Sequence, residues 1–232
     1  MAGDLTISTI NGGPISGMRN TIINGNFGIN QRGYVSGAAT TAGQYTLDRW
    51  KVTGTGGITF STVNSKTTVT IPSGQVLQQV IEGLNLQDGT YTLSWEGTAQ
   101  GKIGAGSFSG SGVTATVTGG TNLTIEFGPG TVSRVQFEPG SVATAFEHRP
   151  IGTELALCQR YYEALGFGMY FTNTNTAAIR VSGSWKVNKR VSPSLTAGAG
   201  NNTAPDAMDA IGWTSSLPTS GTTFYVAASA EL

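Results

Sequence analysis

The sequence predicts an all-β protein, in which a jelly-roll β-sandwich precedes one short helix and a smaller C-terminal β-domain. Three observations lead to this prediction. The 232 residues include 34 glycines and only 11% charged residues, and serine and threonine are abundant, which suits turns and strands and weakens helices. Apolar and polar residues alternate in several short runs, separated by glycine-containing breaks. One segment, after residue 150, has apolar residues at helical spacing instead.

The expected strands of the sandwich precede the helix. In the clearest run Tyr91, Leu93 and Trp95 share one face, which is typical of a half-buried strand. Asp88-Gly89 and Gly119-Gly120 stand between such runs, and both dipeptides suit tight hairpin turns. Many short strands at regular spacing favour a β-sandwich or jelly roll. The alternating runs occupy 90–95, 113–117, 123–127 and 135–137.

The chain is expected to divide into three parts. Residues 1–20 are rich in small and polar side chains and are interpreted as an N-terminal arm or attachment segment. Residues 21–150 form the jelly roll, and 151–232 form the helix with a C-terminal β-domain that trimerises, binds a receptor, or both. Within this last part, 224–232 is expected to be a final strand and 194–202 a loop.

The helix is predicted over 154–165. Thr153 can cap its start and Gly166 can end it. Tyr161 and Tyr162 then lie side by side, about 100° apart around the helix axis. Two interpretations of this pair stay open. Either one tyrosine faces its own domain and the other a neighbouring subunit, or both pack within one subunit.

Charge balance, the N-terminal sequence and the cysteine count each limit the class of protein. Lys plus Arg and Asp plus Glu each number 13, whereas a nucleic-acid binder normally carries a basic excess that neutralises phosphates. The N-terminus has no basic region followed by an apolar core, and no apolar run is long enough to span a membrane. The single cysteine, Cys158, allows no disulfide within the chain, which fits assembly in a reducing cytoplasm.

The sequence contains no recognisable set of catalytic residues, and we expect that the chain is not an enzyme. The only histidine, His148, lies between Glu147 and Arg149 without a nucleophile motif, so it is assigned a structural or interface role. One His and one Cys make a zinc site improbable, and no phosphate-binding glycine loop is present. Glu96 and Glu126 lie out of phase with the apolar residues of their strands, which places them on the solvated face.

Aromatic side chains are the best candidates for binding sugars, because a flat ring can stack on the apolar face of a pyranose. Trp50 and Trp95 are expected in the core instead. Trp213 lies in a Gly- and Ser-rich stretch, and two further aromatics flank a Thr/Asn-rich loop. The candidate ligand-binding residues are Trp213, Tyr170, Phe171 and Trp185.

Three segments, taken in order, resemble phage and prophage tail proteins that carry a domain similar to jelly-roll carbohydrate-binding modules. They are NTIINGNFGINQRG at 20–33, YTLDRW at 45–50, and the stretch from 135 to 162 that contains VQFEPGSVATAFEHRP. The ending ASAEL at 228–232 is also similar to the C-termini of such proteins.

The resemblance implies a jelly roll, a homotrimer as is usual for tail fibres, and partners among other phage tail proteins. It further implies a bacterial surface glycan or other outer-surface receptor, and a place in the virion tail after assembly in the host cytoplasm. Related modules often hold a structural calcium through an acidic residue after an Asn-x-x-Phe motif. Here Gly28 follows Asn24-Gly-Asn-Phe27, which argues against that site, and we expect no cofactor.

The leading hypothesis is a non-enzymatic tail-fibre or receptor-binding protein that attaches the virion to a bacterial surface, with the receptor bound by the C-terminal domain. Three copies per fibre would strengthen the weak binding of single sugar sites through avidity. Two alternatives stay open, a purely structural tail or baseplate connector and a virion-associated glycan depolymerase.

Overall fold

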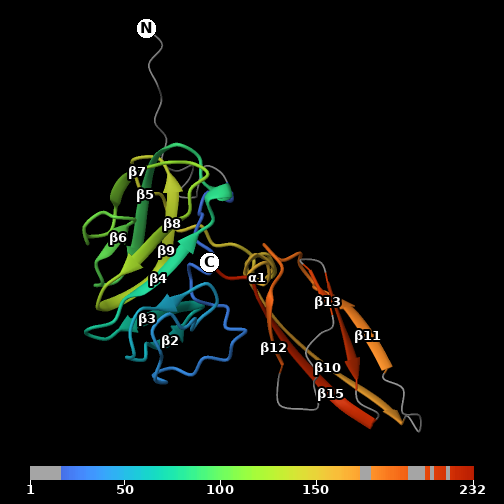
Figure 1. Cartoon of the computed structure of the whole chain (residues 1–232). Coiled ribbons are helices and arrows are strands. Elements are labelled where there is room, and N and C mark those ends of the chain that lie inside the picture. Colours follow the sequence, from blue (N-terminus) through green and yellow to red (C-terminus); the bar gives the residue numbers. More distant parts are fainter. Residues whose placement is uncertain (1–16, 173–178, 198–206, 210–211, 218–219) are drawn as a thin grey trace. The chain divides into compact units, whose positions relative to one another are not determined.

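The computed structural model describes residues 17–172, 179–197, 207–209, 212–217 and 220–232. The chain forms two compact units, Met1–Ile151 and Gly152–Leu232. In Figure 1 the strands of the first unit are coloured from blue to yellow and those of the second are orange to red. Apart from one α-helix, the regular structure in the described residues consists of strands and a single short 3₁₀ turn, which confirms the all-β prediction.

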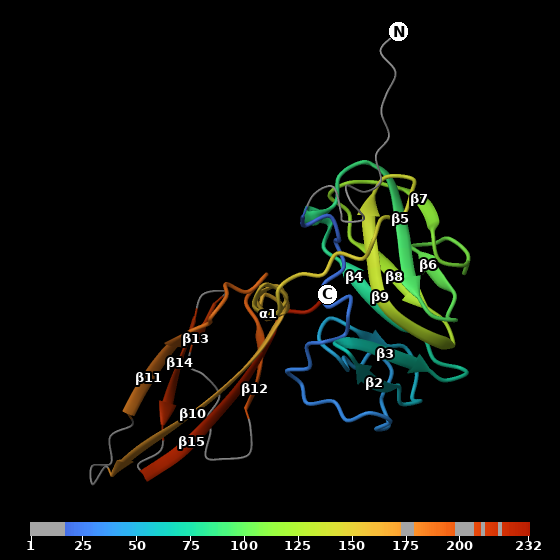
Figure 2. The ribbon, with the colours of Figure 1, turned by 180° about the vertical axis from the view of Figure 1, so that it is seen from behind.

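The first unit consists of two antiparallel sheets, which Figure 2 shows from behind. One sheet has the strand order β1-β4-β8-β6 and the other has the order β2-β3-β9-β5-β7. A 3₁₀ turn, η1 (Gly83–Asn85), follows β4. The strands are β1 (Lys51–Val52), β2 (Thr59–Val63), β3 (Lys66–Ile71), β4 (Leu77–Ile81), β5 (Gly89–Glu96), β6 (Gly101–Ile103), β7 (Val113–Val117), β8 (Leu123–Phe127) and β9 (Gly130–Pro139).

The connections between these strands make the first unit a jelly roll. From β3 to β9, successive strands alternate between the two sheets. The pairs β3·β9, β4·β8 and β5·β7 are nested around β6. This is the arrangement of a long antiparallel ribbon that has been folded over on itself, and the predicted jelly roll is therefore confirmed.

The core lies between the two sheets. Tyr91, Leu93 and Trp95 are all buried, as their alternation in β5 predicts. Trp50 is fully buried, and its indole Nε1–H donates to the carbonyl oxygen of Asn24 at 2.9 Å. The predictions that Trp50 and Trp95 belong to the core are thus confirmed. Buried indoles need such a partner, because an unpaired polar group in the core destabilises the fold.

The two expected hairpin turns are instead crossings between sheets. β4 and β5 belong to different sheets, and so do β7 and β8, so neither Asp88-Gly89 nor Gly119-Gly120 closes a hairpin. Gly89 and Gly120 do have the positive φ angles, 146° and 72°, that favour glycine. The backbone N–H of Gly119 donates to the Asp88 carboxylate at 2.9 Å and ties the two crossings together. Packing across the sandwich therefore decides strand order here, rather than local turn chemistry.

The second unit contains the helix and two further antiparallel sheets. Their strand orders are β10-β15-β12 and β11-β14-β13. The final strand expected from 224 begins four residues earlier, and the 194–202 segment, predicted as a loop, contributes β12 in its described part. The elements are α1 (Ile151–Gln159), β10 (Tyr162–Thr172), β11 (Ile179–Ser184), β12 (Ser194–Ala197), β13 (Ala207–Met208), β14 (Gly212–Leu217) and β15 (Ser220–Ser229).

The prediction of a helix over 154–165 is wrong at both ends. α1 begins at Ile151, directly after Pro150, whose fixed φ and missing N–H suit the start of a helix. It ends at Gln159, and Thr153 lies inside it rather than at its cap. The long antiparallel pairing of β10 with β15 begins at Tyr162 and takes the backbone groups that a longer helix would have used.

Candidate functional site

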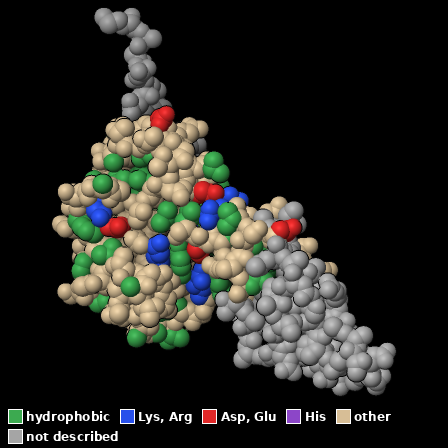
Figure 3. All heavy atoms as spheres, viewed as in Figure 1, with side chains coloured by type: hydrophobic (Ala, Val, Ile, Leu, Met, Phe, Trp, Pro, Cys, Tyr) green, Lys and Arg blue, Asp and Glu red, His purple; other side chains and the backbone are tan. Residues whose placement is uncertain are grey.

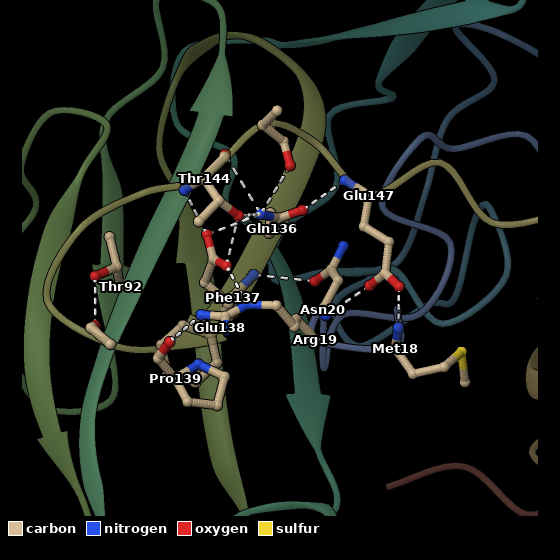
Figure 4. Close-up of polar contacts among 12 residues, drawn as sticks. Met18, Arg19, Asn20, Thr92, Gln136, Phe137, Glu138, Pro139, Thr144 and Glu147 are labelled. Carbon is tan, nitrogen blue, oxygen red and sulfur yellow. Dashed lines mark hydrogen bonds and ion pairs between the residues drawn. The ribbon is translucent and has the colours of Figure 1, made fainter. Parts of the chain in front are cut away.

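A buried carboxylate, Glu138, lies at the centre of a polar network near the end of β9 (Figure 4). Its oxygens accept hydrogen bonds from Arg19 Nε at 3.0 Å and from Gln136 Nε2 at 2.8 Å. Thr144 donates twice, from its backbone N–H and from its hydroxyl, each at 2.7 Å. The carboxylate is therefore surrounded by four donors, one of them cationic.

These donors decide what Glu138 can do chemically. Burial alone would raise its pKa, but the hydrogen bonds from Thr144, Gln136 and Arg19 together outweigh it and hold the pKa below its ordinary value. Glu138 is thus a carboxylate rather than a proton donor at neutral pH. Its four partners also leave little capacity to accept a bond from a ligand. The residue holds the fold together instead of performing acid–base chemistry.

A second buried pair, Glu147 and Arg149, holds the segment that enters the jelly roll. The Glu147 carboxylate accepts from the backbone N–H of Met18 and, at 2.8 Å, from that of Asn20. Nη2 of Arg149 donates to the carbonyl oxygen of Asn20 and, at 3.0 Å, to that of Ile22. We call these two side chains the Glu147/Arg149 clamp. It connects the segment at residues 18–22 to the end of the first unit.

Ion pairs also occur outside this region. Glu96 is 46% exposed and forms ion pairs with Lys66 at 3.0 Å and Arg134 at 2.9 Å, which places it on the solvated face as predicted. In the second unit, Lys189 Nζ and a Glu163 oxygen are 2.5 Å apart, and both side chains are fully buried. Among the described residues, no three His, Cys, Asp or Glu side chains come together in a way that could hold a metal ion.

The aromatic residues proposed as sugar ligands fall in the second unit. Trp185 is 5% exposed, so its ring is packed inside the unit, and its Nε1–H donates to the carbonyl oxygen of Asp209 at 3.1 Å. The backbones of Tyr170 and Phe171 lie in β10, and that of Trp213 lies in β14. The side chains of these three residues lie outside the described part of the chain.

The residues proposed for a subunit interface do not share one helix. Tyr161 lies in the turn after α1 and Tyr162 begins β10. They are 1% and 9% exposed, so both pack within the single chain, which is the second of the two interpretations left open by the sequence. His148 is exposed between the two buried residues of the clamp. Its side chain is therefore available to a neighbour.

The strand register brings together a set of surface residues that no local pattern in the sequence reveals. Across the four-stranded sheet, Tyr45 pairs with Lys51, Lys51 with Gln78, Gln78 with Glu126, and Glu126 with Lys102. Residues directly opposite in neighbouring strands project from the same face. Four strand spacings extend over about 19 Å.

Phe108 completes this row at the end opposite Tyr45. The Lys102 ammonium lies 5.2 Å from the centre of the Phe108 ring, and it forms an ion pair with Glu126 at 2.6 Å. At the other end, Lys51 and Arg32 lie 5.7 and 5.0 Å from the Tyr45 ring. We call the residues of this row the polar band: Tyr45, Lys51, Gln78, Glu126, Lys102 and Phe108. None of these six residues is buried.

In Figure 3 the Lys, Arg, Asp and Glu side chains cover only a small part of the face shown, among hydrophobic side chains and tan atoms of the backbone and other side chains. Charged residues make up only 11% of the chain, so a row of two ammonium groups, a carboxylate, an amide and two rings is a local concentration of groups that can bind a ligand. Ammonium, carboxylate and amide groups can donate to or accept from hydroxyls, and the rings offer apolar faces.

Comparisons with protein-family models, with curated proteins and with solved structures find no match to this chain. In the described residues, no helix combines the length and the apolar character needed to cross a membrane. The function must therefore be inferred from the residues themselves.

Proposed function

We propose that this chain is a non-enzymatic phage tail protein that attaches the virion to a bacterial surface glycan. It acts as a homotrimer among other tail proteins. Two observations support the proposal. The segments at 20–33, 45–50 and 135–162 resemble phage tail proteins, and the first unit is the jelly roll that this resemblance leads one to expect.

The polar band is the observation that best supports the proposed glycan binding. Tyr45 and Phe108 provide rings at its two ends, and Lys51, Gln78 and Lys102 provide hydrogen-bond donors between them. A sugar chain presents hydroxyls along its length and apolar ring faces, so it matches a row of this kind. The band belongs to the first unit, which adds a second candidate surface to the C-terminal residues.

The test is binding of the full chain to bacterial surface polysaccharides on an array, followed by competition with virions for adsorption to host cells. Tyr45→Ala and Phe108→Ala should each weaken glycan binding about tenfold, because each removes one ring contact. Val63→Ala on β2 is the matched control, since Val63 is 66% exposed and lies in the other sheet. Unchanged binding in both ring variants would remove the band from the proposal.

A purely structural connector is the second candidate, and one observation favours it. Residues in the motifs that carry the resemblance are buried and hold the fold: Asn24, Asp48, Trp50 and Arg149 are all at most 8% exposed. Such motifs are typical of the folded jelly-roll module and do not indicate a ligand-binding site. Imaging the protein in a virion separates the candidates, because an adhesin lies at a distal tip and a connector does not. A glycan depolymerase has less support, since Glu96, Glu126 and Glu138 are all engaged by cations.

A further inference from the structure

The two sheets of the first unit end at β1, β6, β2 and β7, and three of these edge strands are covered. Residues 43–44 bond to the backbone of β1 at 2.8 and 3.0 Å. Ser109 exchanges two backbone hydrogen bonds of 2.9 Å with Gly101 of β6. On β2, the Ser36 hydroxyl accepts from the Phe60 N–H at 2.8 Å and donates to the Phe60 carbonyl oxygen at 3.2 Å.

The fourth edge strand, β7, is open. Its only neighbour among the described strands is β5 (Figure 1), where Tyr91 lies opposite Ala115. The residue before Tyr91, Thr90, accepts a backbone bond of 2.8 Å from the residue that follows β9. By alternation, Tyr91 and Ala115 then bond to each other, and the N–H and C=O groups of Thr114 and Thr116 point away from the sheet. In the part of the chain that the structure describes, no group bonds to these four.

The side chains of β7 also suit an added strand. The sequence VTATV at 113–117 contains neither a charge nor a proline, which commonly protect a strand edge. Val113 and Ala115 pack against the core but are only partly buried, whereas Thr114 and Thr116 are exposed. A further strand would cover the two apolar side chains and satisfy the four backbone groups.

The chain itself contains a segment with a matching pattern. Residues 5–9, with the sequence LTIST, belong to the 16 residues that precede the described part. They carry no charge, and Leu5 and Ile7 alternate with hydroxyl side chains as Val113 and Ala115 do in β7. Opposite residues in paired strands share a face, so the apolar side chains of both segments meet on the core side. We propose that residues 5–9 of a second copy of this chain add to β7 as an antiparallel strand.

The point where the N-terminal arm joins the first unit favours a second copy over the same chain. The N–H of Thr21 donates to the carbonyl oxygen of Phe137 at 2.9 Å, on the side of β9 that faces away from β5. Three strand spacings, about 14 Å, therefore separate this point from β7. An arm that docked on its own β7 would have to cross the face of its own sheet. An arm from a second copy can approach the open edge directly.

Each copy gives one arm and receives another, so the contact joins two different surfaces. Contacts of this heterologous kind close into a ring where the rotation between copies allows it. The trimer of the proposed function is a ring of this kind. This last step rests on the proposed function, whereas the docking of the arm on β7 requires no glycan.

Disulfide trapping between two variants of the full chain tests the docking. Ser8→Cys is mixed with Thr116→Cys under oxidising conditions without glycan, and the linked peptides are identified by mass spectrometry. The matched control is Ser8→Cys with Thr62→Cys, because Thr62 is also an exposed threonine but lies on the covered edge strand β2. The product that links residues 8 and 116 of different chains should exceed the control product about tenfold, since docking raises the local concentration of the two thiols. Equal yields overturn the proposal.

A double variant, Ser8→Cys/Thr116→Cys, separates docking between copies from docking within one chain. Oxidation should give covalent species that end at three chains, as a closed ring requires. A disulfide found only within single chains overturns docking on a second copy, and a series that ends at another number overturns the ring. Trapped arms in a protein that binds no polysaccharide would refute the proposed function and leave this inference intact. Polysaccharide binding without trapped arms would do the reverse.

Discussion

At the scale of single residues, the surroundings of each carboxylate decide its contribution. Glu138 is fully buried and accepts from Arg19, Gln136 and Thr144. Glu96 is 46% exposed between two cations, and the hydrogen bond from Lys66 is the main reason why its pKa lies below the ordinary value. Both carboxylates are ionised at neutral pH. Only for the buried one does the loss of charge leave a buried donor, the Gln136 amide, without its ionised acceptor.

Replacing Glu138 by Gln should lower the free energy of unfolding at pH 7 by about 1–3 kcal/mol, because one of the two buried oxygens that accept from Arg19, Gln136 and Thr144 becomes an amide donor. The folded-state pKa of Glu138 lies below its ordinary value of 4.5. Its stabilisation is therefore complete above about pH 4.5 and is lost as the pH falls through the folded-state pKa. Urea unfolding of the wild type and of Glu138→Gln should show a difference that shrinks in acid.

Glu96→Gln is the matched control for this prediction, because it changes the same group in solvent. Its free energy of unfolding should stay within about 0.5 kcal/mol of the wild type. If the effect of Glu138→Gln were as small, or persisted undiminished in strong acid, the account of Glu138 as a buried structural charge would be wrong.

At the scale of elements, the short strand β6 depends on a close approach to the core. A Cβ added at Gly101 would lie 2.8 Å from the Trp95 ring and 3.0 Å from the Phe127 ring. Both rings belong to the core, and they pack edge to face with centroids 5.1 Å apart. Glycine at 101 therefore allows β6 to close the four-stranded sheet over the two rings.

Gly101→Ala should lower the free energy of unfolding by about 1–3 kcal/mol, because the added methyl group forces the Trp95 ring or β6 to move. Gly110→Ala serves as the comparison, since nothing lies within 4 Å of a Cβ built there. Denaturant unfolding followed by tryptophan fluorescence measures both variants. Equal stabilities of the two would mean that β6 tolerates displacement and does not depend on its glycine.

Elements whose pattern is local could be predicted from the sequence. The alternation of Tyr91, Leu93 and Trp95 predicted β5, because successive residues of a strand lie on opposite faces of the sheet and the pattern is visible within the segment itself. The end of α1 was missed because Tyr162 pairs with Ser229, which lies 67 positions further along the chain. Helical periodicity in a short segment cannot reveal such a competitor.

The candidate site was harder to predict for the same reason. In Lys102, Glu126 and Gln78 the sequence shows only polar positions out of phase with apolar neighbours. Their alignment in one row depends on the register among β4, β6 and β8, which follows from the jelly-roll connections. The Glu147/Arg149 clamp likewise joins residues more than 120 positions apart. The sequence shows which residue types are present, but it does not show that they lie together in the fold.

At the scale of the whole molecule, the proposed trimer and the polar band together imply binding through several weak sites. A single band offers two rings and a few polar groups on an open sheet face, which bury little of a sugar chain. Such a site is expected to bind weakly on its own. If the proposed trimer forms, its three bands would bind a repeating surface polysaccharide by avidity, with an overall gain of 10²–10⁴-fold.

Binding to a densely coated polysaccharide surface should therefore be about 100-fold or more tighter than binding to the free repeating unit in solution. The assembly should have three times the 24.0 kDa mass of one chain. Surface binding at several polysaccharide densities, compared with calorimetry on the soluble repeating unit, measures the gain. Lowering the density until single assemblies can reach only one ligand should remove it, because the second and third contacts are then too far apart. An affinity that does not change with density, in a protein confirmed as a trimer, would show that the bands do not act together.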